Sequence, residues 1–245
     1  MGNDNSTAGT LFLDMSRTAL LPPNVNDEEF RQKMIENWKL QAWKDWHINS
    51  NQIKGLPTMD SKTIVMAAED ITTWMQKNAL QNLVILETMA GNCEASFICY
   101  SIFRDYVIHW WATDHTRFEI KRTFPESFTF VQCDSVAAVQ RLGNSADILL
   151  MISPPCSMPI KETDDVCGFA DYYACHDFIQ MSIGQPKPKY IIFVGELGAS
   201  DGTEGMYNYM LKHPRLFLSS RVMLTKGVLG VMGDYEKELF IFQII

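Results

Sequence analysis

Two segments near the start of the chain carry apolar residues at helical spacing. In the first, apolar side chains recur at every fourth position from Phe30, and in the second they recur at three and four after Asp60. This spacing predicts two amphipathic helices, each preceded by a polar residue that suits a helix cap. We expect a helical extension over residues 26–80 and, before it, an irregular arm over residues 1–25.

The pattern changes after residue 80. Short, continuously apolar runs, typical of strands that are covered on both faces, alternate with segments of helical spacing. The predicted strands cover residues 83–86, 107–112, 128–133, 146–152 and 190–194. The predicted helices cover residues 93–104, 135–142, 169–183 and 203–212. Strands that alternate with helices in this way predict a mostly parallel sheet.

The last stretch of chain has no helical pattern. Two apolar runs, at residues 216–224 and 239–244, are separated by a segment that contains Gly227, Gly230 and Gly233, which suits a hairpin connection. We therefore expect an α/β domain, built as a Rossmann-like, mostly parallel seven-stranded sheet with a C-terminal β-hairpin. This domain is expected over residues 81–245.

The composition is that of a folded chain with an acidic balance. Of the 245 residues, 47% are apolar, and the formal net charge is −8. Tight, sequence-independent binding to nucleic acid comes from Lys and Arg that displace counterions, so long duplex DNA is a poor substrate candidate. A nucleobase that enters a small pocket is compatible with this charge.

The sequence also bears on compartment and metal binding. No apolar stretch approaches the roughly 18 residues of a membrane span, and no signal-peptide pattern opens the chain, so we expect an intracellular protein, cytoplasmic or nuclear, with no membrane span. Gly2 lies in a short pattern for N-myristoylation, but no basic cluster follows it to strengthen membrane binding. The cysteines and histidines lack zinc-ligand spacing, so we expect free thiols and no metal.

The predicted strands end in polar residues. Ligands of open α/β sheets lie at the carboxyl ends of the strands. The residues found there are, in chain order, Glu87, Asp114, Asp134, the tetrapeptide Ser153-Pro154-Pro155-Cys156 and Glu196. A single acid has an ordinary explanation, since Asp134 can cap the helix predicted after it. Polar residues at all five strand ends favour a binding site at this edge.

The segment from Glu87 to Cys93, Glu-Thr-Met-Ala-Gly-Asn-Cys, resembles a loop of the class I S-adenosylmethionine-dependent methyltransferases. That family has acid–x–Gly–x–Gly–x–Gly after its first strand, with a variant Glu-Pro-x-Ala-Gly-x-Gly among nucleic-acid amino-methyltransferases. Glycine is needed because the backbone passes close to the methionyl part of the cofactor. Only Gly91 of the glycines is retained. The resemblance covers about residues 83–245, and the absence of G-x-G-x-x-G argues against a nicotinamide dehydrogenase.

The resemblance implies S-adenosyl-L-methionine as cofactor and roles by position. Asp114 would accept hydrogen bonds from both ribose hydroxyls, which suits the two oxygens of a carboxylate. Asp134 would receive the adenine amine, and Glu87 would orient the methionyl amine directly or through water. The other cofactor contacts that the resemblance implies are Met89, Gly91, His115, Ser135 and Ser153.

Ser153, Pro154, Pro155 and Cys156 are the expected catalytic residues. They resemble the (Asp/Asn/Ser)-Pro-Pro-(Tyr/Phe/Trp) signature of enzymes that methylate an exocyclic amine of adenine or cytosine. There the first side chain and a carbonyl fixed by proline hold the amine before the reaction. The aromatic member stacks on the flipped base, whereas Cys156 cannot stack. We expect methyl transfer to an amine of a nucleobase, in RNA or single-stranded nucleic acid, or of a small molecule.

Two alternatives stay open. Cytosine carbon-5 methyltransferases carry Gly-Pro-Pro-Cys-Gln, whose cysteine attacks the ring. Cys156 and Glu196 occupy comparable positions, although Ser157 replaces the glutamine. The other alternative is a non-catalytic protein that keeps the methyltransferase fold as a scaffold or as the partner subunit of an active enzyme, in view of the missing glycines and the missing aromatic residue.

Overall fold

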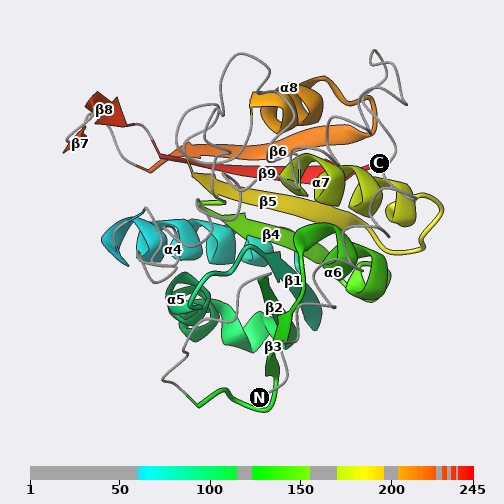
Figure 1. The fold of residues 1–245 in the computed structure, drawn as a ribbon, viewed down its shortest axis with the longest axis horizontal. Helices are drawn as coiled ribbons and strands as arrows, with labels where there is room; N and C mark the ends of the chain where they lie inside the picture. Colours follow the sequence, from blue (N-terminus) through cyan, green and yellow to red (C-terminus); the bar gives the residue numbers. More distant parts are fainter. Residues whose placement is uncertain are drawn as a thin grey trace, which may run out of the picture.

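A computed structural model describes most of the chain from Met59 onward. The described residues are 59, 61–114, 123–154, 170–195, 204–224, 228–230, 233–235 and 237–245. They form a seven-stranded sheet with helices on both faces (Figure 1). The predictions for the arm, for the first helix and for Gly2 lie outside the described residues.

The sheet contains the seven strands that the apolar runs predict. They are β1 (Leu83–Thr88), β2 (Val107–Asp114), β3 (Phe128–Gln132), β4 (Ile148–Ile152), β5 (Lys189–Gly195), β6 (Leu216–Met223) and β9 (Glu238–Ile244). Their order is β3-β2-β1-β4-β5-β9-β6. The first five strands in this order are parallel to one another, and β9 is antiparallel to both β5 and β6. The expected sheet, with its C-terminal antiparallel hairpin, is confirmed.

The connection from β6 to β9 contains secondary structure of its own. β7 (Val228–Gly230) pairs antiparallel with β8 (Gly233–Tyr235) in a separate two-stranded sheet. The glycines of this segment predict a turn, but a turn signal gives no information about short strands on either side of it. The hairpin is therefore more elaborate than the sequence indicates.

Within the described part of the chain, five helices cover the two faces of the sheet. They are α4 (Ser61–Lys77), α5 (Glu94–Phe103), α6 (Ser135–Leu142), α7 (Ala170–Ser182) and α8 (Glu204–Lys212), with a short 3-10 helix, η1 (Arg104–Tyr106), after α5. Successive strand residues point to opposite faces, so Ile85 packs with α4 and α5, whereas Leu86 packs with α6 and α7. Two apolar cores result, one on each face.

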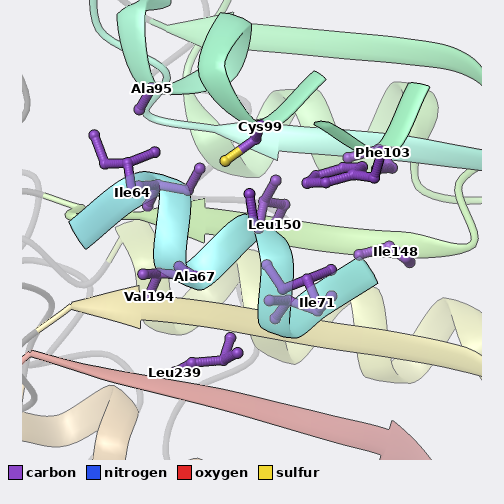
Figure 2. Packing of buried hydrophobic residues seen from close by; sticks show 14 of the residues in the cluster. Ile64, Ala67, Ile71, Ala95, Cys99, Phe103, Ile148, Leu150, Val194 and Leu239 are labelled. Carbon is purple, nitrogen blue, oxygen red and sulfur yellow. The ribbon is translucent and has the colours of Figure 1, made fainter. Parts of the chain in front are cut away.

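Helix α4 belongs to one of these cores. Figure 2 shows its apolar side chains, Ile64, Ala67 and Ile71, directed at the sheet, where Leu150 and Leu239 lie. In the structure α4 buries its apolar face on the sheet, and the domain division expected at residue 80 stays a prediction. Helical spacing identifies an amphipathic helix, but it does not identify the surface that the apolar face covers.

Two simpler expectations concern thiols and membranes. The cysteines among the described residues, Cys93, Cys99, Cys133 and Cys175, are free and buried. Within the same residues, no helix is both long enough and apolar enough to cross a membrane.

Candidate functional site

The strand order brings several of the expected site residues to one edge of the sheet. The chain runs from β1 outward to β2 and β3, and then returns to β4 on the other side of β1. In open α/β sheets ligands bind beside the point where the order reverses, at the carboxyl ends of the strands. Glu87, Asp114 and Asp134 lie at or just after the ends of β1, β2 and β3, and Ser153 follows β4.

The loop between β1 and α5 has the backbone of a glycine loop. Met89, Gly91 and Cys93 have φ angles of 60°, 56° and 62°. This left-handed region favours glycine and costs other residues roughly 1–2 kcal/mol. The three residues are those at which the acid–x–Gly–x–Gly–x–Gly pattern places its glycines. Met89 and Cys93 therefore have a backbone conformation that suits glycine, although neither of them is a glycine.

The side chain of Cys93 does not occupy the space above this loop. Cys93 is 0% exposed and belongs to the apolar core beneath α4 and α5. Cys93, which stands where the family pattern has its last glycine, is thus accommodated because its side chain is buried in the core. A ligand that approaches the loop from outside meets the backbone there.

Hydrogen bonds fix the loop to the end of β2. The N–H of Gly91 donates to Oδ2 of Asp114 at 2.9 Å, and the N–H of Ala90 donates to the carbonyl of Thr113 at 2.9 Å. Thr113 Oγ1 in turn donates to the carbonyl of Glu87 at 2.9 Å. Asp114 and Gly91, expected from sequence to act on the same ligand, are in direct contact.

Glu87 lies beneath the loop and is almost fully buried, with 1% of its surface exposed. Trp110 Nε1 donates to Oε2 of Glu87 at 2.9 Å. Burial raises the pKa of this carboxyl to about 7, and the nearby charge of Asp114 adds to the rise, while the neighbouring Ser96 hydroxyl and the Trp110 hydrogen bond oppose it. At neutral pH the group is thus close to half protonated.

Asp134 caps helix α6. Its Oδ1 accepts the N–H groups of Val136 and Ala137, both at 2.9 Å. The N–H of Cys133, which precedes it, donates to the carbonyl of Asp114 at 2.9 Å, so Asp134 follows directly on the junction of β2 and β3. The capping role considered from sequence is present, and a carboxylate has lone pairs enough for further donors.

Ser153 holds an unusual backbone conformation at the end of β4. Its φ is 46°, its N–H donates to the carbonyl of Val194 at 2.7 Å, and it is 8% exposed. Pro154 after it is buried. A left-handed non-glycine residue is often found where a site is held in a defined geometry. Pro155, Cys156, His115 and Glu196 lie outside the described residues.

Three contributors to this site were missed by sequence reasoning. Trp110 and Ser96 surround the Glu87 carboxyl, and Thr113 fixes the loop. Trp110 lies four positions before Asp114 in β2, and residues two and four apart share a face of a strand. This alternation in the sequence indicates that Trp110 and Asp114 share a face of β2. It does not indicate that Trp110 contacts Glu87, because that contact depends on the register of β2 against β1.

Comparisons with known proteins bear on the fold. No family model and no curated protein matches this chain. Among solved structures, the 1,6-didemethyltoxoflavin-N1-methyltransferase of Burkholderia thailandensis, with bound 1,6-didemethyltoxoflavin and S-adenosylhomocysteine, aligns with a TM-score of 0.50 at 10% identity, over 92% of this chain and 93% of that one.

A second solved structure agrees. A Listeria monocytogenes protein assigned as a class I S-adenosylmethionine-dependent methyltransferase aligns with a TM-score of 0.53 at 15% identity, over 78% of this chain and 62% of that one. At such identities the likeness concerns the fold. With its strand order and its sheet-edge loop, this chain has the fold of the class I S-adenosylmethionine-dependent methyltransferases.

Proposed function

We propose that this protein is an S-adenosyl-L-methionine-dependent methyltransferase that acts on an amine, in a nucleobase of RNA or single-stranded nucleic acid or in a small molecule. The observation that carries the proposal is the loop after β1. Three left-handed residues, Met89, Gly91 and Cys93, lie at the glycine positions of the family pattern, and Gly91 is bonded to Asp114. Strain of this kind persists where the surrounding structure requires it.

The residues at the sheet edge fit an adenosyl cofactor. Asp114 accepts the ribose hydroxyls, because its two oxygens have lone pairs beyond the one that takes the Gly91 N–H. Asp134 receives the adenine amine from its place at the start of α6. When bound, the cofactor supplies an electrophilic methyl group. The chain itself contributes binding, orientation and exclusion of water.

The acceptor would be held at the segment that begins with Ser153. Its backbone is fixed by the bond to Val194 and by the left-handed φ, so this segment is placed before the acceptor arrives. A neutral amine needs little acid–base assistance to accept a methyl group. Alignment of the two reactants contributes most of the acceleration, and such effects reach roughly 7–11 kcal/mol.

Cofactor binding is the first test. Calorimetric titration with S-adenosylhomocysteine should give micromolar binding, and Asp114→Asn should weaken it at least tenfold. Asp105→Asn, a change at an exposed acid in η1, should leave the affinity unchanged. Absence of binding by folded protein, or equal affinity of Asp114→Asn and the unmodified chain, would contradict the proposal.

Methyl transfer is the second test. Labelled cofactor is incubated with the protein and separate RNA, DNA, protein and metabolite extracts. We expect label in RNA or in an amine metabolite, and Ser153→Ala should lower the transfer rate. If the cofactor binds but no extract accepts label, the non-catalytic alternative is correct instead.

A further inference from the structure

Glu87 and Trp110 form an isolated polar contact inside an apolar core. Trp110 is 0% exposed, and its ring stacks on Phe103 at 5.4 Å and on Phe128 at 5.8 Å. The indole therefore has one orientation, and its N–H is directed at Oε2 of Glu87, 2.9 Å away. A buried carboxyl held by a rigid donor has a fixed position.

A second carboxyl lies on the same face of the neighbouring strand. Glu87 is paired in register with Ala112 of β2, two positions before Asp114, so the two acids are close neighbours at the sheet edge. The charge of Asp114 disfavours the charged form of Glu87. Asp114 is itself held by Gly91 and cannot move away without releasing the loop.

The other groups around Glu87 do not compensate its charge. The start of α5 brings the thiols of Cys93 and Cys99, whose pKa values burial raises, and the hydroxyl of Ser96. On the β4 side Glu87 is paired with Leu150, and α4 presents an apolar face. Among the described residues, no basic side chain contributes to the pKa of Glu87. Its carboxyl consequently keeps a proton up to about pH 7.

We propose that Glu87 and Trp110 are a proton-linked positioning pair, in which Glu87 loses its proton to solvent when the amino-acid part of the cofactor binds over the adjacent loop. The inference rests on the proposed function. The O–H bond of the carboxyl breaks and the proton passes to buffer, and the resulting carboxylate would hold the ammonium group of the cofactor. A nearby positive charge favours the ionised carboxylate, and the Trp110 N–H stabilises the same form.

Calorimetry measures this proton directly. Titrations with S-adenosylhomocysteine are repeated between pH 6 and 8 in pairs of buffers that differ in ionisation enthalpy. We expect release of most of a proton near pH 6, about half near pH 7 and little at pH 8. These amounts follow if the Glu87 carboxyl has a pKa of about 7 before the cofactor binds. Methylthioadenosine, which lacks the amino-acid part, should bind without releasing a proton.

Variants identify the group that releases the proton. Glu87→Gln should abolish release while binding continues, and His109→Gln, a change at a histidine of β2 that contacts Trp111, should retain it. Trp110→Phe removes the donor that stabilises the carboxylate, so the pH midpoint of release should move upward. Trp111→Phe is the matched control, because Trp111 contacts His109 and packs on the other core, and it should leave the midpoint unchanged.

The outcomes separate the two proposals. Binding of S-adenosylhomocysteine without proton release at any pH from 6 to 8, or release that survives in Glu87→Gln, overturns the pairing of Glu87 with Trp110 and leaves the methyltransferase assignment intact. A purely structural role of Trp110 would weaken binding equally at every pH, which also overturns it. No binding at all contradicts the proposed function.

Discussion

Among single residues, those of the loop after β1 have a strained backbone that hydrogen bonds hold at the end of β2. Met89 and Cys93 hold left-handed backbone angles that only glycine adopts freely. Cys93 is fully buried, so its side chain adds packing that offsets part of the cost. Met89 is only half-buried, and its strain has less compensation.

Met89→Gly should therefore stabilise the protein. Relief of the left-handed strain gains roughly 1–2 kcal/mol and the more flexible unfolded chain gives back about half of it, so we expect a net increase of about 0.5–1 kcal/mol in chemical denaturation. Asn92→Gly, at a neighbour whose φ is not positive, should lower stability. A less stable Met89→Gly variant would show that the strain is compensated by contacts of the side chain.

Glu87 should make stability depend on pH. Its pKa rises from an ordinary value of 4.5 to about 7 in the folded protein, so the folded state binds the proton more tightly than the unfolded state. The contribution of this bound proton to the free energy of unfolding is complete below about pH 4.5. It is lost as the pH rises to about 7, which lowers the free energy of unfolding by about 3 kcal/mol. Glu87→Gln, which stays neutral, should remove this slope from the free energy of unfolding measured between pH 5 and 8.

At the scale of elements, helix α6 is held at both ends by charged side chains. Asp134 accepts N–H groups at its start, and Lys189 Nζ donates to the carbonyls of Gly143 and Asn144 after its end, at 2.8 and 2.9 Å. Anionic and cationic groups at these ends also suit the helix dipole. Lys189 comes from β5, so it ties the helix to the middle of the sheet.

Substitutions of Asp134 should separate its two roles. Asp134→Ala removes the cap and should cost about 1 kcal/mol of stability. Asp134→Asn keeps a capping oxygen and should unfold within about 0.5 kcal/mol of the unmodified chain, yet bind S-adenosylhomocysteine more weakly because it lacks the charge. Equal affinity of Asp134→Asn and the unmodified chain would limit Asp134 to capping.

At the scale of the whole molecule, α4 completes the core on one face of the sheet. It packs on β4 and β5 and shares its core with Leu239 of β9, so it joins strands from well separated parts of the sequence (Figure 2). Trp74 also donates from α4 to Ser219 Oγ of β6 at 3.1 Å. We propose that the folded domain begins at or before α4.

Ile71→Ala tests this proposal in the full chain. Ile71 is 0% exposed, and loss of a buried isoleucine side chain costs about 2–5 kcal/mol. Ile108→Ala, at a residue that is 55% exposed, should change stability by less than about 0.5 kcal/mol. If α4 were a separate extension, Ile71→Ala would leave the main unfolding transition of the sheet, followed by circular dichroism, unchanged.

The seven strands of the main sheet and the helices from α4 onward are predictable because their signals are local. A buried strand needs a short apolar run, and an amphipathic helix needs apolar residues at three and four, whatever the rest of the chain does. The residues at the strand ends, from Glu87 to Ser153, were readable for the same reason. Trp110 was not, because its role depends on which side chain of β1 faces it.

Local patterns along the chain identify the seven strands of the main sheet, the helices that alternate with them and the polar residues at the strand ends. Tertiary structure alone decided that Glu87 lies beneath the loop while Asp114 holds it, that Cys93 fits a glycine position by pointing into the core, and that α4 packs on the sheet. Local patterns depend on neighbours in the chain. Register, burial and backbone strain instead follow from many weak contacts between distant segments, which are settled together as the chain folds.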